Sequence, residues 1–381
     1  MKYIFWLLTL SFISCTHPVQ ESSLKKLDVS FASAIPSIRL SEFASSVECI
    51  PLAVRDSVIM GELMQVMIKD SFIYAADRAS VYKFSLSGDL MAMISHKGNA
   101  PTEYVSISDF QVDKDGDAWV LSRSNKALYK YTWDGSLQKK VPLDIWAEKF
   151  SFGGETQILL YTGNEKTEEY GHALYKLDLQ TGELTDRYLP INDDKSGYLH
   201  VMSQNHFTCG DASYFFYQMF NDTIYAFNEV GALVPEYLLS FDGKNIPDSF
   251  YEQKYSDIMD FFQHLFKKDY AYGTGLFLKS DTSCLYSLIY DKRVYWSMTK
   301  EGKRALGNVL KDDVCLAGYE IPLGDISCFV QDNNQVVIPL SPYFIMEYVN
   351  KQADEQERDN ITRILKYSGE DQNPVLLKIK L

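Results

Sequence analysis

The chain has 381 residues, of which 46% are hydrophobic and 23% charged, so it can bury a sizeable core and is not a disordered chain. Acidic side chains outnumber basic ones by 51 to 37, which gives a formal net charge of -14. This balance opposes binding to a phosphate backbone, and no basic stripe along the chain offsets it. We therefore expect no nucleic-acid partner.

The first 14 residues have the pattern of an export signal. Lys2 is followed by a mostly apolar stretch over residues 4–13, and Ser14 places a small residue directly before Cys15. The stretch is shorter than the roughly 20 residues that a membrane-spanning helix needs. Its end resembles a bacterial lipoprotein signal, although Phe12 stands where leucine is usual. Cys15 is the expected lipidation site, and an ordinary secretory signal is the alternative.

The residues that follow divide into a lead-in and one domain. Residues 16–23 are polar and carry no hydrophobic pattern, which is typical of a flexible tether. We assign residues 15–46 to a lipid-anchored tether and lead-in, and residues 47–381 to a single domain.

The cysteines do not indicate a disulfide framework. Beyond Cys15 their number is odd, they are widely scattered, and no two form a CxxC pair. Buried small hydrophobic residues are the default interpretation, with at most one or two bridges. These residues are Cys49, Cys209, Cys284, Cys315 and Cys328.

A repeat is the main signal in the domain. Four segments share the pattern of an alternating strand, a turn with glycine and the start of a second strand: residues 81–90, 128–137, 174–184 and 224–233. Their tyrosines, Tyr82, Tyr129, Tyr175 and Tyr225, are spaced by 47, 46 and 50 residues. Another aromatic or β-branched strand precedes each segment. Each unit is therefore predicted to be a four-stranded antiparallel meander.

Units of this kind and length predict an all-β fold, a β-propeller. Residues 47–381, less two insertions of about 20 to 25 residues, leave room for six blades of about 48 residues, the spacing of the repeat. The later blades are degenerate, with residues 294–302 as the fifth copy and residues 328–338 opening the sixth. The apolar strand at 47–52 is expected to pair beside residues 375–379 and close the ring.

Two insertions in the C-terminal half interrupt the β pattern. Residues 250–270 place apolar side chains at helical spacing, and residues 342–366 begin with a proline at a plausible first helical position. Both are predicted to be helical. They either cap the mouth of the channel or cover apolar surface of the blades.

The loop at residues 96–104, together with residues 50–52 and 106–110, resembles the six-bladed β-propeller lipoproteins of Bacteroidota, many of which are known only as domains of unknown function and are distantly similar to NHL-type propellers. Gly98, Pro101, Glu103 and Tyr104 match the loop of that family, while two of its glycines are replaced. The resemblance covers essentially the whole mature chain. It implies a lipid-anchored protein of the cell envelope, in the outer membrane, with its periplasmic or surface face left open.

The same loop is the predicted ligand-binding site. It joins two blades near the channel, where His96 and Lys97 can meet an anion, Glu103 and Asp109 can accept hydrogen bonds, and Tyr104 can stack on a sugar or peptide. The alternative is structural: Glu103 and Tyr104 fix the crossover by bonding its backbone amides.

No catalytic pattern is present, since the chain lacks HExxH, GxSxG, a phosphate-binding GxxxxGK[ST] and GxGxxG. We therefore predict no catalytic residue, no metal ligand set and no cofactor. The predicted function is binding of a glycan, a peptide or an envelope protein by a lipid-anchored monomer. The alternative is a lyase or hydrolase whose carboxylates gather at the channel mouth from separate blades.

Overall fold

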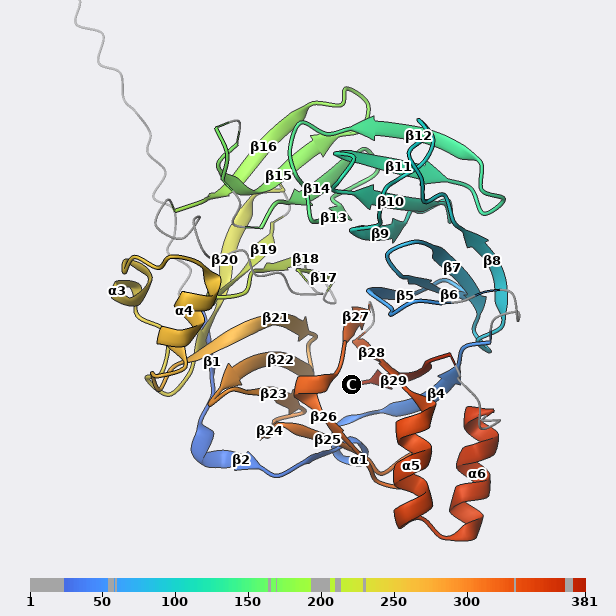
Figure 1. Cartoon of the computed structure of the whole chain (residues 1–381). Coiled ribbons are helices and arrows are strands. Elements are labelled where there is room, and N and C mark those ends of the chain that lie inside the picture. The colour runs from blue at the N-terminus through green and yellow to red at the C-terminus, as the bar shows by residue number, and fades with distance from the viewer. Residues whose placement is uncertain are drawn as a thin grey trace, which may run out of the picture.

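The computed structural model describes residues 24–53, 58, 60–163, 166–168, 170–192, 206–209, 214–228, 231–331, 334–366 and 373–381. The export signal and the lipidation site predicted at Cys15 lie outside these residues. The described strands form separate sheets arranged in a ring, which is the β-propeller that the repeat predicts (Figure 1).

The first three sheets are regular four-stranded antiparallel meanders. The first consists of β5 (Gln65–Lys69), β6 (Phe72–Ala76), β7 (Val81–Ser85) and β8 (Leu90–Ile94). The second consists of β9 (Asp109–Val112), β10 (Ala118–Ser122), β11 (Ala127–Tyr131) and β12 (Leu137–Pro142). The third consists of β13 (Lys149–Phe152), β14 (Gln157–Tyr161), β15 (His172–Asp178) and β16 (Leu184–Pro190).

The next two sheets each gain a fifth, parallel strand from the N-terminal segment. The fourth consists of β17 (Phe207–Cys209), β18 (Tyr214–Tyr217), β19 (Thr223–Phe227) and β20 (Leu233–Ser240), with β1 (Lys25–Asp28) at its edge. The fifth consists of β21 (Ala271–Lys279), β22 (Ser283–Tyr290), β23 (Arg293–Lys300) and β24 (Lys303–Gly307), with β2 (Ala34–Ile35) at its edge. Residues assigned to the lead-in thus lie along the outer edges of the sheets.

The predicted count of six blades is wrong, because the described strands form seven sheets. The sixth along the chain has three short strands: β26 (Tyr319–Pro322), β25 (Val309–Asp312) and β3 (Ile38–Arg39). The last consists of β27 (Phe329–Gln331), β28 (Gln335–Leu340), β29 (Val375–Lys380) and β4 (Ser46–Pro51). The division of the chain by the repeat length did not predict the three-stranded sheet. This sheet contains only residues 309–322 of the C-terminal half, and its third strand, β3, comes from the lead-in.

Closure of the ring by the N-terminal strand is confirmed. Strand β4 pairs antiparallel with β29, with Cys49 opposite Leu377. The innermost strand of this last sheet, β27, contacts β5 of the first sheet and β21 of the fifth. The pairing of β4 with β29 gives the outer strand of the last sheet a backbone partner and joins the two ends of the domain.

The hairpins predicted from the repeat are also confirmed. The turns after β7, β11, β15 and β19 each have a glycine at positive φ, a conformation that strains residues with a Cβ atom. These glycines are Gly88, Gly135, Gly182 and Gly231. At Gly88 a second constraint applies, since a Cβ atom would lie 2.1 Å from the carbonyl oxygen of Pro51. This turn therefore packs directly against the end of the closing strand.

The core lies between neighbouring sheets. All five residues of β10 are buried, whereas most of the outermost strand β12 is exposed. One apolar cluster joins the first and second sheets, and others join the second to the third and the last to the first. Each sheet therefore buries both of its faces against its neighbours.

Both predicted helical insertions are confirmed, and both cover apolar surface. The first holds α3 (Asp248–Tyr251) and α4 (Ile258–Leu265), and the second holds α5 (Pro342–Gln352) and α6 (Glu355–Leu365). Their apolar sides join clusters at the rim of the ring (Figure 1). A short helix, α1 (Leu40–Phe43), and two 3-10 turns, Phe31–Ser33 and Leu323–Asp325, complete the described helices. None of these is long and apolar enough to cross a membrane.

A buried aspartate organises the turn between β9 and β10. Asp113 Oδ1 accepts hydrogen bonds from the backbone amides of Asp115 and Asp117, both at 3.0 Å. Its Oδ2 accepts from Trp119 Nε1 at 2.9 Å and lies 2.7 Å from Lys130 Nζ. Burial opposes ionisation, but the bonds from Lys130, Trp119 and Asp117 outweigh it and hold the pKa of Asp113 below its ordinary value.

We expect Asp113→Asn to lower the free energy of unfolding at neutral pH by about 2 kcal/mol, because charge-assisted hydrogen bonds are lost. The folded pKa lies below the unfolded one, so the stabilisation is present above the unfolded pKa and is lost as pH falls through the folded pKa. Urea unfolding of both proteins from pH 7 downward should show the difference shrinking in acid. Asp115→Asn, an exposed neighbour in the same turn, is the control, and a difference independent of pH would contradict the prediction.

Candidate functional site

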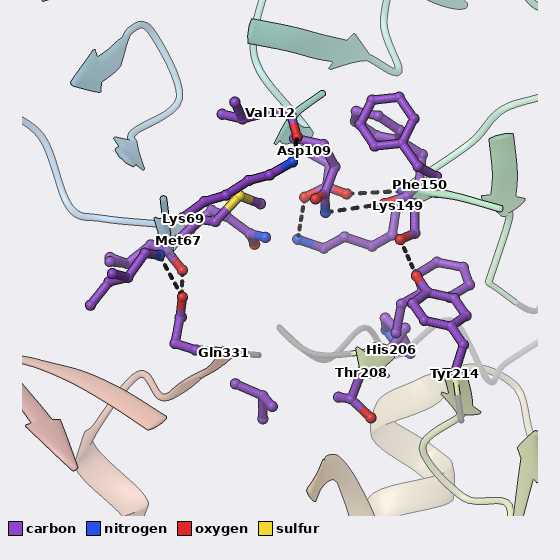
Figure 2. A pocket seen from close by; sticks show the side chains of 18 residues that line it. Met67, Lys69, Asp109, Val112, Lys149, Phe150, His206, Thr208, Tyr214 and Gln331 are labelled. Atoms are coloured by element: carbon purple, nitrogen blue, oxygen red, sulfur yellow. Dashed lines mark hydrogen bonds and ion pairs between the residues drawn. The ribbon is translucent and has the colours of Figure 1, made fainter. Parts of the chain in front are cut away.

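A pocket of about 230 Å³ lies on the axis, where the innermost strands converge (Figure 2). Residues of β5, β9, β13, β17 and β27 form its walls, together with His206, directly before β17, and Tyr214 from β18. The lining combines amide, hydroxyl, ammonium, carboxylate and imidazole groups with aromatic rings. Such a concave site with a few convergent polar groups is the usual form of a ligand-binding pocket.

Four polar residues occupy the same position in four consecutive sheets. In each sheet, the repeated tyrosine of the third strand pairs with a residue of the second strand, and that residue pairs in turn with an apolar residue of the innermost strand. The polar residue stands directly before this apolar residue in the sequence. We call these four residues the axial ring: Gln65, Asp109, Lys149 and His206. All four line the pocket. The repeat thus places an amide, a carboxylate, an ammonium and an imidazole around one cavity.

Asp109 and Lys149 form an ion pair within this ring. Asp109 is almost fully buried, and its Oδ1 lies 3.4 Å from Lys149 Nζ. Its Oδ2 accepts a hydrogen bond from the backbone N–H of Phe150 at 2.9 Å. Burial raises the pKa of the Asp109 carboxyl, and the nearby Lys149 ammonium and Phe150 N–H only partly offset this effect. The pair therefore places a strong donor and a strong acceptor in a poorly hydrated wall.

The fourth sheet contributes an imidazole and aromatic rings to the pocket. His206 is buried, its Nδ1 lies 2.9 Å from the carbonyl oxygen of Tyr217, and its ring lies 4.3 Å from that of Tyr161. Tyr214, which is half-buried, donates a hydrogen bond to Ser151 Oγ of the neighbouring sheet. Figure 2 shows His206, Thr208 and Tyr214 on the side of the pocket opposite Lys69.

Gln65 differs from the other ring members. Its Oε1 is buried and has no hydrogen-bond partner among the described residues. A buried acceptor without a partner lowers stability, so such a group calls for an explanation beyond folding. Because Gln65 lines the pocket, a donor on a bound ligand can supply the missing partner.

Two other side chains join neighbouring sheets at the axis. Lys69 Nζ donates to the carbonyl oxygens of Val112 at 2.8 Å and Asp113 at 3.0 Å. Gln331 accepts from the backbone N–H of Ile68 at 2.6 Å and donates to the carbonyl oxygen of Val66 at 2.9 Å. Together with the bond from Phe150 N–H to Asp109, these contacts cross from one innermost strand to the next. We call Lys69, Asp109 and Gln331 the axial staples.

The predicted site residues separate into two groups. Asp109 lines the axial pocket, but His96, Lys97, Glu103 and Tyr104 do not. Tyr104 is fully buried, its hydroxyl donates to the carbonyl oxygen of Ala79 at 2.9 Å, and burial raises its pKa to about 12.

Within the loop at 96–104, the remaining three residues make contacts to their neighbours. Glu103 accepts from the backbone N–H of Ala100 at 2.8 Å, and His96 stacks on Tyr131 with ring centroids 5.1 Å apart. Lys97 forms an isolated β-bridge with Tyr104. A Cβ atom at Gly98 would lie 1.9 Å from the Glu103 carboxylate, so a larger residue there would displace this side chain. These contacts fit the structural alternative, in which the loop fixes the crossover between blades.

Sequence reasoning missed Gln65, Lys149 and His206. A signal was present, because each stands one residue before the apolar position that faces the repeated tyrosine across its sheet. The innermost strands are short and differ in sequence, so the position becomes visible only once the register is known.

The lining limits the chemistry that the pocket can support. Among the described residues that line it, Asp109 is the single carboxylate, and it is already bonded to a backbone amide and an ammonium. A hydrolase that uses paired carboxylates needs a second one within reach of the substrate. The described lining can form hydrogen bonds to a ligand, and the carboxylate in it already has two partners.

We expect Gln331→Ala to lower the free energy of unfolding by about 2 kcal/mol, because the buried amide of Ile68 and carbonyl of Val66 lose their partner. Urea unfolding measures this change. Gln138→Ala removes the same side chain from an exposed position of β12 and should change stability by less than about 0.5 kcal/mol. Equal effects of the two substitutions would contradict the role assigned to Gln331.

Comparison with known proteins agrees with this architecture. A Bacteroides fragilis protein described as exported, BF0058, superposes with a TM-score of 0.71 at 17% identity, covering 94% of this chain and 100% of that one. A member of the DUF4221 family from Bacteroides vulgatus superposes with a TM-score of 0.52 at 11% identity, covering 88% and 96%. No curated protein matches the sequence. A family model matches residues 25–380, and the chain therefore belongs to the domain of unknown function DUF4934.

Proposed function

We propose that this propeller is a binding module of the cell envelope, and that its axial pocket holds one polar unit of a ligand, either a sugar residue or a peptide side chain. The observation that supports this proposal is the axial ring: four consecutive sheets direct polar groups of different hydrogen-bonding character at one cavity. Folding alone does not require four such groups at equivalent positions, since an apolar residue would bury equally well there.

The composition of the pocket indicates the class of ligand. Gln65 and Gln111 offer amides, Lys149 offers a donor and Asp109 an acceptor, while the ring of Phe207 is only half-buried. Hydroxyl and amide groups of a ligand can pair with these side chains, and an apolar face can stack on an aromatic ring.

The size of the pocket limits how much of the ligand enters it. The cavity of about 230 Å³ is smaller than the roughly 300–1,000 Å³ of pockets that enclose drug-sized molecules. It therefore takes a single residue of a larger glycan or peptide, and the rest of that chain lies outside the cavity.

Gln65→Met tests the pocket, because it keeps the length of the side chain and removes its hydrogen-bonding groups. We expect the substitution to leave thermal stability unchanged or slightly raised, since an unpaired buried acceptor is removed. Binding of a ligand that uses this acceptor should weaken by about tenfold, the equivalent of one hydrogen bond. The measurement is saturation-transfer NMR, followed by calorimetric titration, with a panel of neutral and acidic monosaccharides, disaccharides and tripeptides.

Gln138→Met, at an exposed position of β12, is the matched control and should bind as the wild type does. A ligand that binds Gln65→Met and wild type equally would contradict the assignment of the pocket. If no member of the panel binds, and an envelope protein is instead captured equally by wild type and Gln65→Met, the pocket is not the recognition site.

The proposal also includes attachment to the envelope through a lipid on Cys15. Its support is the pattern of residues 1–15, an apolar stretch followed by a small residue and a cysteine. The B. fragilis protein of similar fold is described as exported, which agrees with this address. A propeller held by a single lipid anchor remains free to present its axial face to a partner.

Cys15→Ser should move the protein from the membrane fraction to the soluble fraction of a Bacteroides host and abolish its labelling by a radioactive fatty acid. The reason is that a serine cannot form the thioether that joins the lipid to the chain. Cys328→Ser, which removes a buried thiol of the last sheet, is the control and should stay in the membrane fraction. Lipid labelling that persists in Cys15→Ser would refute the anchor.

A further inference from the structure

Two cysteines and an aspartate lie together where the sixth and last sheets meet. The sulfur atoms of Cys49 and Cys315 and a carboxylate oxygen of Asp312 lie within 4.8 Å of one another. Cys49 belongs to the closing strand β4, Asp312 is the last residue of β25, and Cys315 lies in the turn that follows. The sequence does not reveal this cluster, because its members come from opposite ends of the domain.

The carboxylate is oriented by its own turn. Asp312 is fully buried, and its Oδ1 accepts hydrogen bonds from the backbone amides of Val314 at 3.0 Å and Cys315 at 2.8 Å. Its Oδ2 is buried and has no hydrogen-bond partner in the part of the chain that the structure describes. A carboxylate oxygen left in this state destabilises the fold unless a cation or donor reaches it.

Cys49 and Cys315 are only partly buried, unlike Cys284 and Cys328, which are buried elsewhere. The Cys315 thiol donates a weak hydrogen bond to the carbonyl oxygen of Val47, 3.2 Å away on β4. This contact brings the turn after β25 against the closing strand, so the three ligand atoms converge without further movement of the backbone.

We propose that Cys49, Asp312 and Cys315 bind one zinc ion, which ties the closing strand to the turn after β25. Two sulfur ligands and one carboxylate suit this borderline-soft cation and disfavour calcium or magnesium, which prefer oxygen ligands alone. The fourth position of the tetrahedron is left to water. Binding converts both thiols to thiolates and releases their two protons to solvent, so the charge of the ion is met by two thiolates and one carboxylate.

A disulfide between Cys49 and Cys315 is the competing outcome. It would leave Oδ2 of Asp312 without a partner, whereas a metal ion would satisfy that atom. The two outcomes are also mutually exclusive, because sulfur atoms that are bonded to each other are not thiolate ligands. The reduced protein therefore provides the decisive test.

The first experiment titrates the reduced, metal-free protein with Co²⁺ and then displaces it with Zn²⁺. We expect one equivalent of Co²⁺ to give thiolate-to-cobalt charge-transfer absorption and the visible bands of a tetrahedral ion, and Zn²⁺ to abolish both. Zinc should also raise the melting temperature, because it binds the folded state. Absence of thiolate charge transfer, or a Cys49–Cys315 disulfide in the natively purified protein found by peptide mapping, would overturn the proposal.

Variants then assign the ligands. Cys49→Ser and Asp312→Asn should each weaken zinc binding by more than about tenfold. Asp313→Asn is the matched control: Asp313 is the next residue, and its carboxylate accepts from the backbone and hydroxyl of Ser41 at 3.0 and 2.7 Å. It should bind zinc as the wild type does. Equal loss in Asp312→Asn and Asp313→Asn would contradict the assignment.

A measurement on the wild type covers the case in which a variant fails to fold. Zinc should slow alkylation of Cys49 and Cys315 by iodoacetamide by more than about tenfold, because a coordinated thiolate is a poorer nucleophile. Peptide mapping resolves these sites from the remaining cysteines. Alkylation rates at the two sites that do not change with zinc would overturn the proposal.

Discussion

The axial pocket depends on hydrogen bonds that cross from one innermost strand to the next. Among the described strands, neighbouring sheets share no backbone ladder at the axis, so the amides of Ile68 and Phe150 take their partners from side chains. The axial staples supply them, and Lys69 adds two bonds to carbonyl oxygens of β9. These contacts link the innermost strands of neighbouring sheets directly. Without them, the polar groups of the axial ring would have no fixed relation to one another.

The polar side chains at the axis fall into two sets: those that bond the backbone of a neighbouring sheet, and those whose polar atoms could bond a ligand. Lys69 and Gln331 have their polar atoms engaged with backbone groups, so they contribute shape. Asp109 belongs to both sets, because one oxygen bonds Phe150 N–H and the other faces Lys149. Gln65 belongs to the second set, since its acceptor is unused by the described chain. If a ligand binds this acceptor, no contact between sheets has to break, so stability and binding would be separable at Gln65.

The sequence predicted the repeated hairpins of the blades, but it did not predict the parts of the fold that have no repeat. Alternating strands and turn glycines specify a hairpin locally, so four units and the closing strand were found. The three-stranded sheet has no local signature, because β3 comes from residues remote in the chain and β25 and β26 are short. The loop at 96–104 is the predicted ligand site because it joins two blades near the channel, and its buried Tyr104 and the bond from Ala100 N–H to Glu103 fit the alternative, in which it fixes this crossover. Of the residues predicted to bind a ligand, only Asp109 lines the axial pocket, whereas the four in the loop contact the loop itself and its neighbours.

The N-terminal segment constrains how an anchored propeller would sit at a membrane. It adds β1, β2 and β3 to the edges of three successive sheets before β4 closes the ring. The first residues of the described chain therefore pair with the outer strands of these sheets. The chain enters at Lys25, which pairs with Tyr237 at the edge of β20. If Cys15 carries a lipid, the ten peptide steps to Lys25 span at most about 35 Å. The edge of the fourth sheet at β1 and β20 would then lie within that reach of the lipid. An axial pocket reached from either end of the ring is compatible with that attachment, whereas one on the rim at β20 would be obstructed by it.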